Sequence, residues 1–224
     1  MPEDYYAVYL QGLFIKHTNR GRQTMKTAKE ILEKKAFIIA EIDKKFSNSN
    51  ELWGNAETKL SSIMEKYHDL PKGVHMHTDN FIFPSAAIYL TLKEVTSQGI
   101  AYEIVENAAI DHSMETGRKL AKMMGVPGMK SLFIKIWNPL TKKMFGADSG
   151  FKNVFYQNEK GEYKMDVVAC PYNKYFTELG CPELTKIFCA NDDRCYGNLP
   201  GIEFKRSGTL GTGADRCDFY LRKL

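Results

Sequence analysis

The sequence predicts an α+β fold in which a helical N-terminal two-thirds packs against a C-terminal antiparallel sheet. Up to about residue 145, apolar residues recur every three or four positions, which is the spacing of one helix face. After residue 151 the apolar residues alternate with polar ones in short runs separated by turn residues. No repeat or linker divides the 224 residues, so we expect a single domain, 1–224, with a helical segment over 1–80 followed by 81–224.

The helical part is predicted from amphipathic patterns. Met25, Leu32 and Ile39 share a face of a long helix expected over 18–46. The polar segment 68–84, which contains a proline and a glycine, is predicted to be a loop. Further helices are expected over residues 52–67, 85–97, 101–124 and 129–145.

The C-terminal part is predicted to combine strands with a short helical insertion. Residues 158–162 (NEKGE) carry turn signals between two strand-like runs, which indicates a hairpin. One or two short helices are expected over 172–195. Strands are expected over residues 152–157, 163–170, 202–210 and 216–224.

Charge and composition exclude several classes of protein. The net charge is only +4, and the basic residues of 16–45 are not interleaved with aromatic ones, so a nucleic-acid partner is not expected. No run approaches the ~18 apolar residues of a membrane span, so no membrane partner is expected. The N-terminus shows no basic stretch followed by an apolar one, and the cysteine count is odd, so we expect a cytoplasmic protein with free thiols.

The cysteines are gathered in the C-terminal part of the chain. No two of them have the CxxC spacing of a structural zinc site. Cys170 ends a predicted strand, Cys189 lies on the following helix and Cys217 begins the last strand, so two or three thiols converge if those strands are neighbours. Such a thiol would be a nucleophile only as the thiolate, which needs a nearby cation, base or helix N-terminus.

Arg206 stands out in the predicted strand 202–210. Ile202, Phe204 and Arg206 alternate on one face, so the guanidinium points toward the core, where it must be paired. Two interpretations are open. The first is a buried ion pair with Asp218, Asp192 or Glu183, and the second is a bidentate clamp for a substrate carboxylate.

Two histidine patterns are also candidates. His112 lies beside small alanines on one helix face, where it is either a satisfied core residue or an acid–base group. His75, His77 and Asp79 alternate in the predicted loop, which is a weak metal-ligand pattern, so we assign no metal site.

The segment that holds these residues resembles the L-2-amino-thiazoline-4-carboxylic acid hydrolase family. The resemblance extends over roughly residues 80–224, including the helical run 86–108, and is strongest from residue 170. It rests on the spacing of several C-terminal residues: Cys170, Tyr172, Gly180, Glu183, Cys189, Asp192, Arg206, Thr209, Gly213 and Cys217-Asp218-Phe219.

The resemblance implies hydrolysis of a cyclic thiazoline to an N-carbamoyl cysteine, that is, opening of a small carboxylate-bearing heterocycle or amidine, which we expect at a C–N bond. In that reaction water adds to an amidine-like carbon, so the site needs a carboxylate clamp, a proton donor and a nucleophile or base. The catalytic candidates are Cys170, Cys189, Cys217, Asp192, Asp218 and Glu183. The substrate-binding candidates are Arg206, His112 and Tyr172. No cofactor is expected.

Two functions of other classes remain as alternatives. The domain would be a non-catalytic sensor or carrier if its cysteines only held a small molecule or a metal. It would be an interaction module if residues 20–67 exposed an apolar helix face to a partner, in which case that face would support a homodimer.

Overall fold

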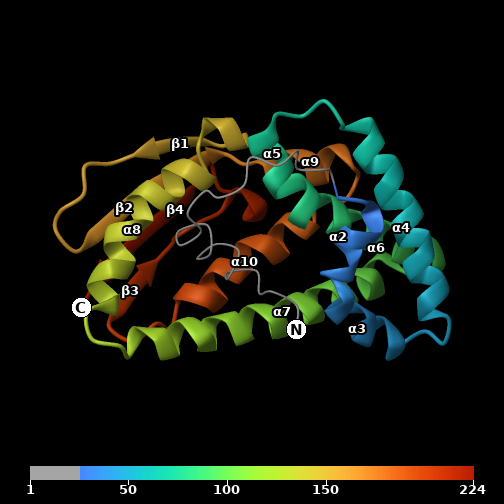
Figure 1. The fold of residues 1–224 in the computed structure, drawn as a ribbon, viewed down its shortest axis with the longest axis horizontal. Helices are drawn as coiled ribbons and strands as arrows, with labels where there is room; N and C mark the ends of the chain where they lie inside the picture. Colours follow the sequence, from blue (N-terminus) through green and yellow to red (C-terminus); the bar gives the residue numbers. More distant parts are fainter. Residues whose placement is uncertain (1–25) are drawn as a thin grey trace.

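The computed structural model describes residues 26–224, so the predicted helix start near residue 18 lies outside the described part. Within it, the predicted α+β architecture is confirmed: helices occupy most of the first two-thirds, and a four-stranded antiparallel sheet occupies the C-terminal part (Figure 1). The helices of the first part are α2 (Ala28–Glu33), α3 (Ile39–Asp43), α4 (Ser49–Lys66), α5 (Lys72–His77), α6 (Phe83–Val95), α7 (Gln98–Met124) and α8 (Met129–Met144).

Two predictions for the N-terminal part are wrong. The long helix predicted to end near Phe46 is broken after α2, where the N–H of Lys34 closes the last turn and the ammonium of Lys35 lies over the ring of Phe81. The predicted loop 68–84 is helical from Lys72 onward, because α5 continues through a π-helical turn (Thr78–Ile82) directly into α6. The polar composition of this segment suggests that it is exposed, but His77 and Thr78 have no exposed surface.

The sheet has the strand order β1-β2-β4-β3, with every neighbouring pair antiparallel. β2 and β4 are therefore the central strands, and Val167 of β2 lies opposite Cys217 of β4. The C-terminal elements are β1 (Lys152–Phe155), β2 (Glu162–Ala169), α9 (Pro171–Glu178), α10 (Leu184–Tyr196), β3 (Ile202–Lys205) and β4 (Cys217–Lys223).

One face of the sheet is buried under α8 and α10. The rings of Trp137 on α8 and Tyr163 on β2 are 5.8 Å apart, as are the rings of Tyr196 on α10 and Phe204 on β3. The opposite face carries polar side chains such as Glu162, which accepts a hydrogen bond from Tyr220. Because apolar inward residues alternate with polar outward ones, the strands could be predicted from the sequence.

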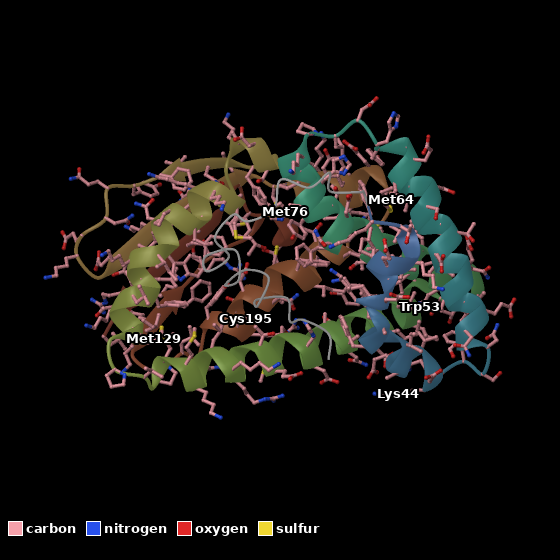
Figure 2. All side chains as sticks on the ribbon, viewed as in Figure 1. Lys44, Trp53, Met64, Met76, Met129 and Cys195 are labelled. Carbon is pink, nitrogen blue, oxygen red and sulfur yellow. The ribbon has the colours of Figure 1, made fainter. Side chains whose placement is uncertain are left out.

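Helix α10 lies between the sheet and α7, and α7 and α10 run side by side in Figure 1. Cys195, which is labelled in Figure 2, lies on α10, and its Sγ is 3.5 Å from the carbonyl oxygen of Ser113 on α7. Among the described helices, none is long and apolar enough to cross a membrane.

The close approach of α7 and α10 depends on Gly117. A Cβ at this position would lie 2.6 Å from the backbone oxygen of Arg194, so Gly117→Ala requires one helix to move. We expect it to lower the free energy of unfolding by about 1–3 kcal/mol. The control is Gly54→Ala in the interior of α4, where a Cβ meets nothing within 4 Å and helix propensity favours alanine by about 1 kcal/mol. Urea denaturation measures both variants, and equal stabilisation by the two would contradict the packing argument.

Candidate active site

A cavity of about 90 Å³ lies between the buried face of the sheet, α8 and α10. Most of its wall is apolar and aromatic, with a few polar side chains. Six of the nine predicted site residues line it: Cys170, Tyr172, Cys189, Asp192, Arg206 and Cys217. The other described lining residues are Trp137, Thr141, Phe145, Phe151, Met165, Val167, Phe188, Tyr196 and Phe219.

The topology explains why three distant cysteines meet. Cys170 caps α9 directly after β2, and Cys217 begins β4, the neighbour of β2. Cys189 lies on α10, which packs against a short 3₁₀ helix (Leu210–Thr212) that precedes β4. Gly211 makes this packing possible, because a Cβ there would lie 2.9 Å from the Sγ of Cys189.

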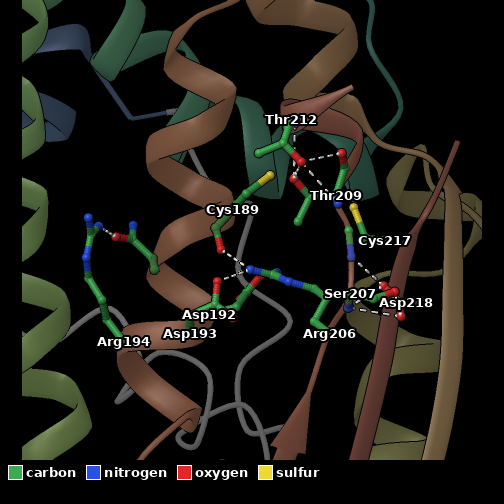
Figure 3. A network of polar contacts seen from close by, with 12 residues as sticks. Cys189, Asp192, Asp193, Arg194, Arg206, Ser207, Thr209, Thr212, Cys217 and Asp218 are labelled. Atoms are coloured by element: carbon green, nitrogen blue, oxygen red, sulfur yellow. Dashed lines mark hydrogen bonds and ion pairs between the residues drawn. The ribbon is translucent and has the colours of Figure 1, made fainter. Parts of the chain in front are cut away.

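Cys189 is the acidic thiol of the three. Its pKa is lowered from the usual value of 9.0 to about 6, first because the thiol of Cys217 donates a hydrogen bond to it. Burial opposes the shift, but the hydroxyl of Thr209, the N–H of Gly211 and the charge of Arg206 all favour the thiolate. Figure 3 shows the Cys189 side chain directed toward Thr209 and Cys217. A thiolate at neutral pH is therefore expected at this position.

The other two thiols are protonated at neutral pH. Burial raises the pKa of Cys170 to about 12. The pKa of Cys217 is raised far above its usual value, chiefly because its proton is engaged by Cys189 and also because the group is buried. The N–H of Leu210 donates to the Sγ of Cys217 at 3.2 Å, which holds this sulfur in place.

Arg206 forms the predicted buried ion pair, with Asp192 as the partner. Its guanidinium donates to Asp192 at 2.7 Å, to the carboxylate of Asp193, and to the carbonyl oxygen of Cys189 at 2.6 Å (Figure 3). Its side chain is only 3% exposed. The inward direction predicted for Arg206 is confirmed, but the predicted strand 202–210 is too long, because β3 ends at Lys205 and Leu210–Thr212 is a 3₁₀ helix. Arg206 directly follows β3 and ties its end to α10.

Asp192 is an unusual carboxyl group. Burial raises its pKa from 3.8 to about 7, although the charge of Arg206 opposes the shift. The side chain is still partly exposed, at 29%, and it lines the cavity. A carboxyl group with a pKa near neutrality can donate a proton in one step and accept it in the next.

Asp218 and Glu183 do not line the cavity. Asp218 accepts hydrogen bonds from the hydroxyl of Ser207 at 2.6 Å and from the N–H of Gly208 at 2.9 Å. Burial works against its charge, but these donors hold its pKa below the usual range. Glu183 accepts a hydrogen bond from Tyr89 and lies 3.7 Å from the ammonium of Lys93. Asp218 thus anchors the segment after Arg206, and Glu183 links α10 to α6.

His112 lines a second, smaller cavity of about 40 Å³ on the α7 side of α10. Its ring stacks on Phe37 with centroids 4.6 Å apart. The structure therefore places His112 apart from the three thiols, and Phe188 lines both cavities.

His77 is a residue near the site that sequence reasoning did not assign to it. Its Nε2 lies 2.7 Å from the carbonyl oxygen of Met144 and must donate, so Nδ1 accepts from the hydroxyl of Tyr172 at 3.2 Å. Burial lowers the pKa of His77 to about 4, which keeps the ring neutral. His77 thereby orients Tyr172. The sequence does not mark His77 as a site residue, because the segment around it is predicted to be a polar loop.

The neighbours of His77 point elsewhere. His75 pairs with Asp79, with Nδ1 and Oδ1 3.1 Å apart, so the three residues of the alternating pattern do not converge. Across residues 26–224, no group of three or more His, Cys, Asp or Glu side chains is arranged to hold a metal ion.

A comparison with known protein families gives a match over most of the chain. The model of the L-2-amino-thiazoline-4-carboxylic acid hydrolase family matches residues 75–221. The chain belongs to this family. The match spans His77, α9, α10 and the strands, and so includes every described residue that lines the larger cavity. No curated protein and no solved structure matches the chain.

Proposed function

We propose that this member of the L-2-amino-thiazoline-4-carboxylic acid hydrolase family hydrolyses a small amidine-containing heterocycle, with Cys189 as the nucleophile. The observation that carries the proposal is a thiol with a pKa of about 6 in the wall of an aromatic cavity, close to a carboxyl group with a pKa of about 7. A thiolate and a neutral acid in one site are the two groups that opening such a ring requires.

In the first step the Cys189 thiolate adds to C2 of a 2-amino-thiazoline, the carbon that carries both nitrogens and the ring sulfur. Collapse of the tetrahedral adduct breaks the C2–S bond, and Asp192 supplies the proton that the departing thiolate needs. The product of this step is an isothiourea that joins Cys189 to the former ring carbon. The substrate's own sulfur is now a free thiol.

In the second step Asp192, now ionised, accepts a proton from the water that adds to the same carbon. Loss of the Cys189 thiolate leaves a urea, which for a 4-carboxylate substrate is N-carbamoyl cysteine. Arg206 assists by fixing the positions of Asp192 and of the Cys189 backbone, because its guanidinium donates a hydrogen bond to each. Tyr172, oriented by His77, faces the same cavity and is proposed to contact the substrate.

The identity of the product decides which bond of the thiazoline ring is broken. N-carbamoyl cysteine keeps both nitrogens on the former C2, so its formation breaks the C–S bond of the ring. Within the ring, a C–N bond breaks, as expected from the sequence, only when the product is S-carbamoyl cysteine. Both products contain the same atoms, and only the first carries a free thiol.

The experiment incubates the purified protein with L-2-amino-thiazoline-4-carboxylate and identifies the product by mass spectrometry after trapping free thiols with an alkylating reagent. We expect turnover with one trapped thiol per product. A product with a free amine and no trapped thiol would contradict C–S cleavage. Absence of turnover, with the ligand nevertheless bound, would favour the alternative of a non-catalytic binding domain.

A further inference from the structure

The charges around the larger cavity leave little positive potential for an anionic ligand. Arg206 is the only basic side chain among the described residues that line it. Its single positive charge is balanced by three acidic groups: Asp192 at 2.7 Å, the carboxylate of Asp193, and the neighbouring Cys189 thiolate. One guanidinium thus faces two carboxyl groups and a thiolate, so the group has no excess of positive charge even when Asp192 carries a proton.

The walls of the cavity favour a cation in a second way. The rings of Trp137 and Tyr196 meet edge to face at 5.0 Å, and Phe188 adds a third ring to the lining. The ring of Phe219 is already covered by the guanidinium of Arg206, 5.3 Å from its centroid. The face of an aromatic ring carries negative partial charge, so it attracts cations and disfavours anions. The aromatic walls and the acidic groups therefore select for the same sign of ligand charge.

Arg206 is poorly placed to clamp a carboxylate. Its Nη1 and Nη2 already donate to two carboxylates and to the carbonyl oxygen of Cys189. A substrate carboxylate would have to compete with Asp192 and Asp193 for the same guanidinium, next to the Cys189 thiolate. Like charges this close in a partly buried site are unfavourable.

We propose that the cavity recognises its substrate through a positively charged amidine, and that the ring carboxylate contributes little to binding. The site would accordingly take small amidines and cyclic isothioureas that lack a carboxylate. The proposal rests on the proposed function for the identity of the reacting carbon, and Arg206 becomes a positioning residue in place of the predicted carboxylate clamp.

The arrangement suits this chemistry. An amidine is a stronger base than an amine because its cation is delocalised, and it enters a neutral solution largely protonated. Its planar cation can stack on the aromatic walls while its N–H groups donate to Asp192. The positive charge also makes the central carbon more electrophilic toward the Cys189 thiolate. Recognition and activation thus use the same group of the substrate.

The test compares two probes by isothermal titration calorimetry on the full chain at neutral pH. 2-Amino-2-thiazoline retains the amidine and lacks the carboxylate, whereas thiazolidine-4-carboxylate retains a ring and the carboxylate and lacks the amidine. We expect the amidine to bind at least about tenfold more tightly, from its cation–π and ionic contacts together. Equal or tighter binding of the carboxylate, or binding of neither probe, would overturn the proposal.

A matched pair of variants tests the charge argument. Asp193→Asn removes one negative charge from the Arg206 cluster, and we expect about threefold weaker amidine binding and stronger carboxylate binding. Asp215→Asn makes the same change at an exposed aspartate that pairs with Arg216, and should leave both affinities unchanged. Equal effects of the two substitutions would contradict recognition through this cluster.

Release of thiol from 2-amino-2-thiazoline is followed in parallel, which separates this inference from the proposed function. Tight amidine binding with no thiol release from either 2-amino-2-thiazoline or the 4-carboxylate substrate would refute the hydrolase and preserve the recognition. Turnover of the 4-carboxylate substrate together with preferential binding of thiazolidine-4-carboxylate would preserve the hydrolase and refute the recognition.

Discussion

Replacing Cys189 with alanine is expected to lower turnover of L-2-amino-thiazoline-4-carboxylate by more than about 1000-fold, the scale on which loss of a nucleophile acts. Cys189 is the thiol with a lowered pKa among the three that line the cavity, while Cys170 and Cys217 are protonated at neutral pH. In the variant, Cys217 loses the contribution of Cys189 to its raised pKa, but burial still disfavours the thiolate of Cys217 and of Cys170. The loss should appear in kcat, because alanine leaves the walls of the cavity intact.

The matched control is Cys195→Ala on the same helix. Cys195 faces α7, where its Sγ approaches the carbonyl oxygen of Ser113, and it does not line the larger cavity. Both variants lose one thiol from α10, so a general effect on the helix would appear in each. Loss of turnover in Cys195→Ala comparable to that in Cys189→Ala, or retention of full activity by Cys189→Ala, would contradict a nucleophilic role. Circular dichroism establishes that both variants are folded.

The convergence of the thiols was predictable from the sequence only in part, namely where it depended on local patterns. Alternation placed Cys217 on the inward face of its strand, and the hairpin signal placed β1 beside β2. Alternation also directed Arg206 inward, although β3 ends at Lys205, one residue before it. The order of β4 between β2 and β3 did not follow from those patterns, since it depends on contacts between strands about fifty residues apart. The prediction therefore had to leave the meeting of the cysteines conditional.

The acidic partner of Arg206 could not be predicted from the sequence alone. Strand alternation indicated a buried guanidinium that must be paired, but it could not choose among Asp218, Asp192 and Glu183. The choice depends on how α10 lies across the sheet, which presents Asp192 to Arg206 and turns Glu183 toward Tyr89. His77 was missed for a related reason. A single polar residue in a polar segment gives no periodic signal, and only tertiary packing buries it.

The reactivity of Cys189 should depend on pH in a way that separates it from an ordinary thiol. Because its pKa is lowered to about 6, the thiolate is formed as the pH rises through that value and is lost below it. The rate of alkylation by iodoacetamide should therefore rise to a plateau above about pH 6, whereas an unperturbed thiol continues to gain reactivity up to about pH 8.5. Peptide mass spectrometry follows Cys189 separately from the other four cysteines.

Cys217 sets this value, because its hydrogen bond to Cys189 is the largest contribution to the lowered pKa. Cys217→Ala removes the donor, and we expect the inflection of the Cys189 profile to move up by at least about one pH unit. Cys217→Ser keeps a hydroxyl at the same place and should retain most of the shift. Both replacements remove the same thiol and leave similar volumes, so they differ mainly in the hydrogen bond. A profile that stays near pH 6 in Cys217→Ala would show that Thr209, Gly211 and Arg206 are sufficient to hold the thiolate.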